Sequence, residues 1–453
     1  MPTSIIDSVF YGDMFTSKRM HLLFSDEARV QGWLDFEAGL ARAQARLGII
    51  PQSAADEITE KAKFASLDFR AMKQEFDRVG FPIIPLVHQF SKILSKDTAR
   101  YLHWGSTTQD VIDSGMALQM RKGFVLLDEM LKELEEVLAS LALRHRDTIM
   151  VGRTMQQQAA PITFGYKIAI WLAEFLRHRE RLRSMRPRVL LGQVAGAVGT
   201  NATLGSQGLD VLREAMIELD LSEPAITWHV SRDNWTEVTS FLALIGASTA
   251  KIGLEVAALM RTEVAEVSEA FEPGRGASST LPQKRNPIIC QPLIAIGKML
   301  REKASLAFDA MVQEHERGVG LMHLEWSLLP EAFVLAGGAL ESASKLLAGL
   351  VVNSDQMSQN INSPRGMVMA EAVMMSLASH IGRDDAHDVV YDACAKCVSE
   401  GLSLRDGLMT DPRINSKLSS AEIDALLDPS NYVGCAPAMV DRVLAMRLSK
   451  SSS

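Results

Sequence analysis

Apolar residues recur three and four positions apart along most of the chain, and few segments alternate apolar with polar residues. The first spacing is typical of amphipathic helices, whereas alternation would indicate half-buried strands. One helix is predicted to begin after Ser25, a good N-cap residue followed by Asp26 and Glu27, and to end before Gly48. The pattern therefore predicts an all-α fold.

Longer periodic segments predict a bundle of long helices. Residues 115 to 146 place leucines on one face, and residues 236 to 271 contain no proline and predict a helix about 50 Å long. Helices are also predicted at 162–186, 291–312 and 328–350. Some of these segments are apolar around much of their circumference, so a single bundle would expose apolar surface that oligomerisation would bury.

The length and composition suit a large protein with several domains. With 453 residues, 47% of them hydrophobic, the chain can bury a large core. We expect an N-terminal helical domain at residues 1–111, a central helical bundle at 112–355 and a C-terminal helical domain at 356–453. The net charge of -8 argues against a nucleic-acid partner, which would require a basic face.

The sequence predicts neither a membrane partner nor a metal site. It begins without the basic and apolar regions of a signal peptide, and no stretch approaches the ~20 apolar residues of a membrane span, so we expect a cytoplasmic protein. The few cysteines are too scattered for a disulfide framework. Cys394 and Cys397 form a CxxC pair without a second pair to complete a zinc site, and helix packing explains it equally well.

The segment GRGASSTLPQKRNP, residues 274–287, has the composition of a functional loop. Gly274 and Gly276 permit unusual backbone geometry, and Pro282 and Pro287 restrict two turns, so hydroxyl and amide groups can be displayed around an anion. An ordinary polar connection between helices would also contain glycine and proline residues. In a second segment, at 106–110, a serine and two threonines precede an aspartate, which predicts a helix N-cap and, with it, an anion site.

The loop at 274–287 resembles the signature loop of the fumarase/aspartase superfamily, GSSxMPxKxNP, with Ala277 and Leu281 as its departures. The similarity extends over essentially the whole chain. Other similar segments are HWGSTTQDVIDSG at 103–115, GRTMQQQAAPITFG at 152–165, QEHERGVGLMHLEW at 313–326 and MAEAVMMSLASHIGRDDAH at 369–387. Within the superfamily, the chain is most similar to the bacterial 3-carboxy-cis,cis-muconate cycloisomerases, and adenylosuccinate lyases are more distant.

The resemblance implies a cofactor-free enzyme that moves a proton at the carbon α to a carboxylate through an aci-carboxylate intermediate. It implies that Ser278 is the base, as an oxyanion stabilised by surrounding backbone N–H groups. The residues implied to bind a di- or tricarboxylate substrate are Ser106, Thr107, Thr108, Gln109, Arg153, Thr154, Gln157, Ser279, Lys284 and Asn286. Further candidates are His103, Met155, His315 and Glu316. The resemblance also implies a homotetramer with a twenty-helix core, in which each active site contains residues of three subunits.

Met155 is the most informative departure from the superfamily. Fumarases and adenylosuccinate lyases have a histidine here that assists proton delivery to the leaving group, and a thioether cannot transfer a proton at neutral pH. A carboxylate with a pKa of about 4 leaves without such help, and so does an aliphatic amine with a pKa of about 10, which is already protonated. Met155 therefore argues against adenylosuccinate and favours lactone chemistry or elimination of an aliphatic amine.

Several interpretations remain open at this point. The leading one is lactonisation of 3-carboxy-cis,cis-muconate, as in protocatechuate degradation through the β-ketoadipate pathway. One alternative is a C–N lyase that releases fumarate from an N-succinyl amine, and another is an inactive oligomeric scaffold that retains the fold. His315 and Glu316 are interpreted either as titratable site residues or as a buried pair that holds helices together.

Overall fold

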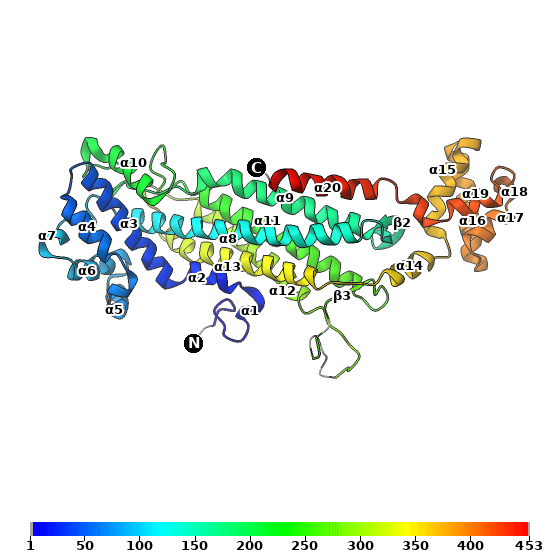
Figure 1. The fold of residues 1–453 in the computed structure, drawn as a ribbon, viewed down its shortest axis with the longest axis horizontal. Coiled ribbons are helices and arrows are strands. Elements are labelled where there is room, and N and C mark those ends of the chain that lie inside the picture. Colours follow the sequence, from blue (N-terminus) through cyan, green and yellow to red (C-terminus); the bar gives the residue numbers. More distant parts are fainter. Residues whose placement is uncertain (1–2, 271, 275, 277, 279, 452–453) are drawn as a thin grey trace. The chain divides into compact units, whose positions relative to one another are not determined.

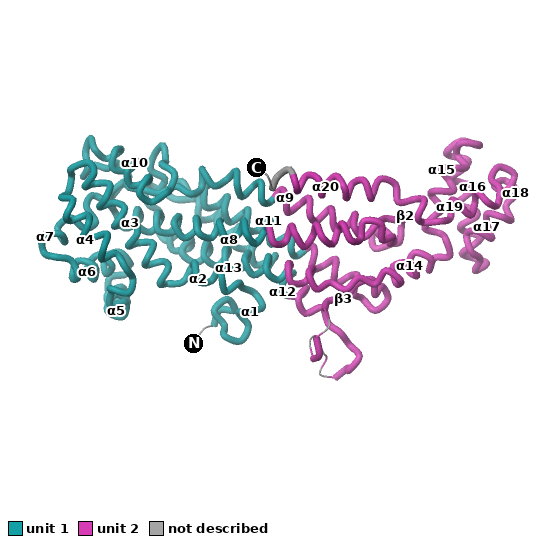
Figure 2. The backbone as a smooth tube through the Cα atoms, viewed as in Figure 1, with its two compact units in different colours: residues 1–131, 178–250, 292–342 teal, residues 132–177, 251–291, 343–453 magenta. Residues whose placement is uncertain are grey.

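The structure is a computed structural model that describes residues 3–451 except 271, 275, 277 and 279. The chain forms two compact units, coloured separately in Figure 2. Unit 1 contains Met1–Leu131, His178–Ala250 and Pro292–Ser342, and unit 2 contains Lys132–Arg177, Lys251–Gln291 and Ala343–Ser453. Both units are mostly helical, as predicted. The division into three domains stays a prediction.

The first part of unit 1 is a cluster of short helices around α3, Asp26–Arg46 (Figure 1). As predicted, α3 begins after Ser25, whose side chain accepts a hydrogen bond from the backbone N–H of Ala28 at 3.2 Å. The buried face of α3 includes Leu34 and Phe36 and packs in one core with the helices around it. The other elements are α1 (Gly12–Phe15), α2 (Lys18–Leu23), α4 (Gln52–Lys61), η1 (Phe64–Ser66), α5 (Phe69–Val79), α6 (Ile83–Ile93), α7 (Lys96–Ala99), η2 (Gly205–Gln207) and α10 (Gly208–Leu219).

Five long helices pass through both units. They are α8 (Thr108–Arg144), α9 (Phe164–Val189), α11 (Asp233–Leu259), α12 (Cys290–Ala310) and α13 (Leu321–Ala348). Within unit 1, the rings of Phe124 in α8 and Phe333 in α13 lie 5.5 Å apart between centroids, and both side chains are fully buried. The hydroxyl of Thr236 in α11 donates to the carbonyl oxygen of Ala307 in α12 at 3.0 Å. The long helices that the periodicity predicted are thus present.

The predicted helix at 236–271 is too long. Helix α11 ends at Leu259, and the following turn includes Ala265, which has a positive φ of 50°. Val267–Ser268 then forms β3, which pairs with β4, Val351–Val352. Strand pairing with a segment about 85 residues away therefore overrides the local helical periodicity, and periodicity alone cannot reveal such a long-range contact.

By length and composition, α11 could also cross a membrane, which the sequence did not lead us to expect. Its most apolar window has a mean hydropathy of 1.5, and 50% of that window is buried inside the protein. Core helices of large helical bundles meet the same criterion. Among the residues that the structure describes, α11 is the only such helix.

Unit 2 contains a β-hairpin and a C-terminal group of helices. The core of the helical group consists of buried apolar residues that include Val373, Leu377, Val390 and Leu404. The helices are α14 (Ser354–Asn362), η3 (Met367–Met369), α15 (Ala370–Ile381), α16 (Arg383–Glu400), α17 (Leu404–Thr410), α18 (Pro412–Asn415), α19 (Ser420–Leu426), η4 (Pro429–Tyr432) and α20 (Ala436–Ser451).

The hairpin of β1 (Ile149–Thr154) and β2 (Gln157–Thr163) was not predicted. Its antiparallel register pairs Thr154 with Gln157, so Met155 and Gln156 alone form the turn. Both turn residues have positive φ, 49° and 63°, which corresponds to a type I′ turn. Such turns normally contain asparagine and glycine. The tip therefore has a conformation that its side chains disfavour.

Candidate active site

Asp110 fastens the segment at 106–110 to the start of α8. One of its carboxylate oxygens accepts the backbone N–H groups of Thr107 at 3.0 Å, Ala195 at 3.1 Å and Gly196 at 3.0 Å. The other oxygen lies 2.8 Å from Nε2 of His229, and both side chains are buried. Asp110 thus caps the helix and holds a second loop beside it. The predicted N-cap cluster is confirmed in this sense.

Gln109 and Arg317 form the next contact of this segment. Gln109 is buried, its Nε2 donates to the carbonyl oxygen of His229 at 2.8 Å, and its Oε1 accepts from Nε of Arg317 at 2.7 Å. Arg317 also donates from Nη1 to the carbonyl oxygen of Ala197 at 3.2 Å. Its Nη2 is buried without a hydrogen-bond partner among the described residues. Because both the oxygen and the nitrogen of the Gln109 side-chain amide have hydrogen-bond partners, the geometry favours a role in positioning Arg317 over direct substrate contact.

His103 is held by a buried carboxylate. Its Nδ1 lies 2.6 Å from Oε1 of Glu37 and 3.0 Å from the hydroxyl of Ser106. Burial alone would lower the pKa of His103, but the charge of Glu37, its hydrogen bond and the nearby Asp110 outweigh burial and raise that pKa. The residue also has a positive φ of 59°. His103 therefore keeps its proton to a higher pH than an ordinary histidine does.

A buried ion-pair network lies one turn further along α8. Arg232 is fully buried and donates to Asp113 at 2.8 and 3.1 Å and to Glu325 at 2.8 Å through two of its nitrogens. Its guanidinium also lies over the rings of Trp228 and Trp235, 4.7 and 4.0 Å from their centroids. Arg232, directly before α11, thus connects α8 through Asp113 with α13 through Glu325, and Trp228, the neighbour of His229, packs against it.

In unit 2, Arg153 anchors the hairpin through a buried carboxylate. Its two Nη groups donate to the oxygens of Glu266 at 2.9 and 2.7 Å, a bidentate pair. Glu266 is fully buried and also accepts from Nδ2 of Asn360 at 2.8 Å. This pairing favours a positioning role for Arg153. Thr154, Met155 and the other side chains at the tip are exposed, and Met155 is 95% exposed.

The hydroxyl oxygen of Ser278 accepts backbone hydrogen bonds from its own loop. The N–H of Leu281 lies 3.1 Å from Oγ, and the N–H of Thr280 lies 3.3 Å from it. This is the turn-capping arrangement that an ordinary loop serine would have. It is also the arrangement that would stabilise an alkoxide at Oγ, since both donors point at the atom that would become negative. The two interpretations therefore describe the same geometry.

Asn286 closes the loop that contains Ser278. Its backbone N–H and its Nδ2 donate to the carbonyl oxygen of Gly276 at 3.0 and 3.1 Å. Beyond the loop, the carboxylate of Glu269 accepts the N–H groups of Ile289 and Cys290 at the start of α12, at 2.9 and 3.1 Å. Lys284 is exposed. Ser279, also predicted to bind substrate, lies outside the described residues.

The predicted site residues belong to two separate units. Ser106, Thr107, Thr108, Gln109 and His103 are in unit 1, and Arg153, Thr154, Gln157, Ser278, Lys284 and Asn286 are in unit 2. His315 and Glu316 are in unit 1 and both are exposed, so the idea that they form a buried pair between helices is wrong. Their substrate roles stay predictions.

Several residues that organise these segments were missed. Glu37, His229, Glu266 and Glu269 are separated from their partners by long stretches of sequence, so no local pattern marked them. Arg317 lies in the similar segment at 313–326 but was given no binding role, and Asp110 was predicted only as part of the N-cap cluster, without its contacts to Ala195 and Gly196. The described residues contain no group of three or more metal-ligating side chains placed to hold an ion.

Comparisons with known proteins identify relatives of this chain. A lyase family matches residues 14–299, and an adenylosuccinate lyase C-terminus family matches residues 366–443. The chain is 44% identical over 434 residues to a 3-carboxy-cis,cis-muconate cycloisomerase of Pseudomonas aeruginosa, covering 95% of each chain. It is 36% identical to an N-acetyl-S-(2-succino)cysteine lyase of Dickeya dadantii, covering 98% of each. It is similar to the structure of a 3-carboxy-cis,cis-muconate lactonizing enzyme from Pseudomonas putida, with a TM-score of 0.91 and 40% identity over 96% of this chain and 98% of the other.

Proposed function

The chain belongs to the fumarase/aspartase superfamily of lyases and cycloisomerases, and on that premise we propose that it lactonises 3-carboxy-cis,cis-muconate with Ser278 as the proton carrier. The observation on which the assignment of Ser278 rests is that its Oγ accepts two backbone N–H groups. These donors would stabilise the alkoxide form of Ser278. In lactonisation the alkoxide remains after the hydroxyl has given its proton to the substrate, and in the reverse direction the alkoxide is the base that removes this proton.

The proposed reaction needs few acid groups. A carboxylate oxygen of the substrate adds to one carbon of a C=C bond, and negative charge develops on the neighbouring carbon and its attached carboxylate. The hydroxyl of Ser278 then gives its proton to that carbon, and Ser278 is reprotonated from solvent. In an active site shared between subunits, as proposed below, the doubly charged aci-carboxylate would be stabilised by Lys284 of one subunit and by Arg317 and the hydroxyls at the start of α8 of another, where the helix dipole is also favourable.

The position of Met155 supports a leaving group that needs no proton. In the direction that opens the lactone, a carboxylate departs as a stable anion. Met155 offers no transferable proton, and Gln156 and Gln157 beside it are amides that cannot serve as acids at neutral pH. A hairpin tip of this composition suits the binding of substrate carboxylates rather than proton delivery.

We propose in addition that the enzyme is a homotetramer with a twenty-helix core and active sites shared between three subunits. Exposed apolar side chains on the long helices support oligomerisation. They include Val125 of α8, Ile170 of α9, Leu254 of α11 and Phe308 of α12, which are 47%, 47%, 62% and 59% exposed. Exposed tip residues at 154–157 and an exposed Lys284 fit sites that a second chain completes. A cytoplasmic location stays a prediction.

A succinyl-amine lyase is the second candidate. It would keep Ser278 as base and release fumarate from the substrate. The relative from Dickeya dadantii is named for a succinyl group on sulfur, not on nitrogen, so it supports a succinyl substrate but not an amine leaving group. The cycloisomerase relatives and the similar lactonizing structure favour the first candidate.

A spectrophotometric assay with 3-carboxy-cis,cis-muconate tests the proposal. The diene absorbance should fall with the native enzyme, and Ser278→Ala should lower the rate roughly 10²- to 10⁴-fold, the range for a general acid–base group. Ser358→Ala is the control, because it removes an exposed serine hydroxyl of α14 and leaves the loop of Ser278 unchanged. Turnover of an N-succinyl amine to fumarate without loss of the diene would support the second candidate, and full activity of Ser278→Ala would contradict both.

A further inference from the structure

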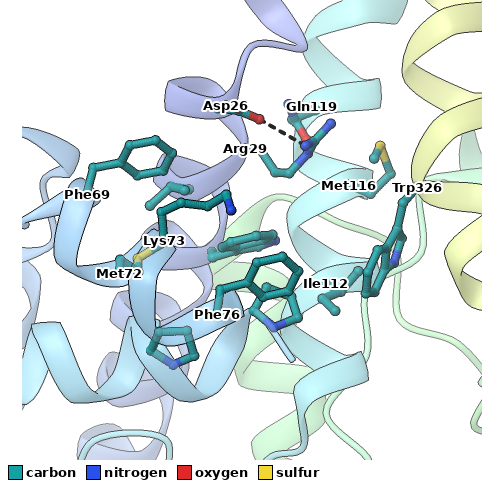
Figure 3. A pocket seen from close by; sticks show the side chains of 14 residues that line it. Asp26, Arg29, Phe69, Met72, Lys73, Phe76, Ile112, Met116, Gln119 and Trp326 are labelled. Carbon is teal, nitrogen blue, oxygen red and sulfur yellow. Dashed lines mark hydrogen bonds and ion pairs between the residues drawn. The ribbon is translucent and has the colours of Figure 1, made fainter. Parts of the chain in front are cut away.

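An apolar pocket in unit 1 lies between α3, α5, α6, α8 and α13 (Figure 3). Its volume is about 240 Å³. Cavities of roughly 150 Å³ with apolar walls hold benzene, so this one has room for a substituted ring. Within the described chain, none of the residues proposed above to bind or convert the substrate lines it.

The walls of the pocket include aromatic rings and methionine side chains. Trp33 of α3 lines it, and Figure 3 shows the rings of Phe76 of α5 and Trp326 of α13 in its wall, with Met116 of α8 close to Trp326. Trp33 and Met116 are 7% and 5% exposed, so a ligand placed between them would lose most of its contact with water. Aromatic and thioether walls favour an aromatic ring over a saturated chain, because edge-to-face and sulfur–ring contacts add to area burial.

Polar groups of this pocket gather toward one end. Gln119 is 3% exposed, and its Nε2 donates to the carbonyl oxygen of Leu23 at 3.0 Å. Its Oε1 is buried without a partner among the described residues. Figure 3 shows Gln119 beside the guanidinium of Arg29, above the rings. A buried acceptor left unpaired is costly, and a ligand that donates a hydrogen bond to it would recover that cost.

The charged side chains of the lining are Asp26, Arg29 and Lys73. Arg29 pairs with Asp26 at 3.1 Å, but the side chain of Asp26 is 71% exposed, so this pair is weak. Lys73 pairs with Asp77, which is also exposed, and its ammonium lies 5.9 Å from the ring centroid of Phe76. The lining thus contains two cations and one carboxylate, and both cations have only exposed, weakly held carboxylate partners, so they remain available to an anionic ligand.

We propose that this pocket binds an aromatic 2-hydroxycarboxylate at a site separate from the catalytic one. The ring lies between Trp33, Phe76 and Trp326. The carboxylate meets Arg29 and Lys73, and the adjacent hydroxyl donates to Oε1 of Gln119. A hydroxyl next to the carboxylate is required because the guanidinium of Arg29 lies beside Gln119, whose Oε1 is the unpaired acceptor (Figure 3). The proposal does not depend on the reaction assigned to Ser278.

Three probes test the site by isothermal titration calorimetry on the full-length protein: 3-phenyllactate, 3-phenylpropanoate, which lacks the hydroxyl, and lactate, which lacks the ring. We expect 3-phenyllactate to bind roughly five- to tenfold more tightly than 3-phenylpropanoate, the value of one hydrogen bond to a buried acceptor. Lactate should bind without detectable heat. Binding of all three with equal affinity, or of none, would overturn the proposal.

Variants locate the site. In Gln119→Leu the preference for 3-phenyllactate over 3-phenylpropanoate should fall to about one, because the acceptor is gone. Arg29→Met should weaken both aromatic probes roughly three- to tenfold, whereas Arg70→Met, which removes an exposed arginine of α5 outside the pocket, should change neither. Thermal unfolding of each variant confirms that it is folded. An unchanged preference in Gln119→Leu would contradict the assignment.

Ser278→Ala separates this proposal from the proposed function. The variant should bind 3-phenyllactate with the native affinity, and saturating 3-phenyllactate should leave the KM for 3-carboxy-cis,cis-muconate unchanged. Simple competition between the two ligands would overturn the claim of a separate site. A native enzyme that binds 3-phenyllactate but does not convert the muconate would leave the pocket assignment intact and refute the reaction instead.

Discussion

Both oxygens of the fully buried Glu266 accept hydrogen bonds from Arg153, at 2.9 and 2.7 Å. This pair ties the β1–β2 hairpin to the segment that precedes the loop of Ser278. We predict that Glu266→Gln lowers the free energy of unfolding by roughly 1–3 kcal/mol, since Arg153, whose side chain is 21% exposed, loses its counter-charge and one of its charge-assisted hydrogen bonds. Equilibrium urea unfolding measures the change. Glu255→Gln, which weakens the partly exposed pair with Lys167, is the control and should cost about 1 kcal/mol or less.

Asp110 is predicted to matter for substrate binding through the segment that it holds. Asp110→Asn leaves a single acceptor oxygen without the negative charge, so the N–H groups of Thr107, Ala195 and Gly196 and the ring of His229 can no longer each face a carboxylate oxygen. We expect a higher KM with a smaller change in kcat, together with a loss of about 1–3 kcal/mol in stability. Steady-state kinetics measures the first effect. Asp97→Asn, at an exposed position on α7, should change neither quantity, and an unaltered KM in Asp110→Asn would count against a role for this segment.

Removal of Arg232 should make stability depend on pH. In Arg232→Met, Asp113 and Glu325 remain buried without a cation, and burial already raises the pKa of Glu325 in the native protein. A carboxyl whose pKa is higher when folded stabilises the fold at low pH and loses that contribution as pH rises. The variant should therefore melt at a lower temperature than the native protein at pH 8 and recover part of the difference at pH 5. A constant difference would contradict this account.

The pair of Glu37 and His103 should show its own pH dependence. Glu37 raises the pKa of His103 against the opposing effect of burial, so the pair stabilises the fold fully below the ordinary histidine pKa of about 6.5. That contribution is lost as pH rises through the higher folded pKa. The melting temperatures of native protein and Glu37→Gln should thus differ most in mild acid and converge above neutrality. When His103→Gln is added to both proteins, the difference in melting temperature caused by Glu37→Gln should no longer depend on pH. This result would identify His103 as the titrating group.

The sequence predicted the parts of the fold that local patterns determine. Ser25 and the acidic residues after it marked the start of α3, and the three-to-four spacing marked the long helices. The end of α11 at Leu259 escaped prediction because it depends on pairing between β3 and β4, which are far apart in the chain. The hairpin escaped because its turn contains neither asparagine nor glycine, the usual signal.

Some residues of the candidate site could likewise be predicted from local motifs, whereas their long-range partners could not. Motif spacing brought attention to Ser278 and Asn286. In the loop, Oγ of Ser278 accepts backbone N–H groups and Nδ2 of Asn286 donates to Gly276, and their substrate roles stay predictions. The partners that position the other residues were out of reach, because Arg153 and Glu266 are 113 residues apart and Asp110 and His229 are 119 apart. A single sequence contains no record of such pairings, which arise only when the helices pack.

The turn at Met155 and Gln156 places two non-glycine residues at positive φ, so this tip is less stable than it could be. Replacement by Asn-Gly should raise the melting temperature, because those residues adopt a type I′ turn with little strain. If the stabilised protein also loses activity, the thioether and amide have been retained at the expense of thermostability. The hairpin tip would then be a place where directed evolution for heat resistance works against catalysis.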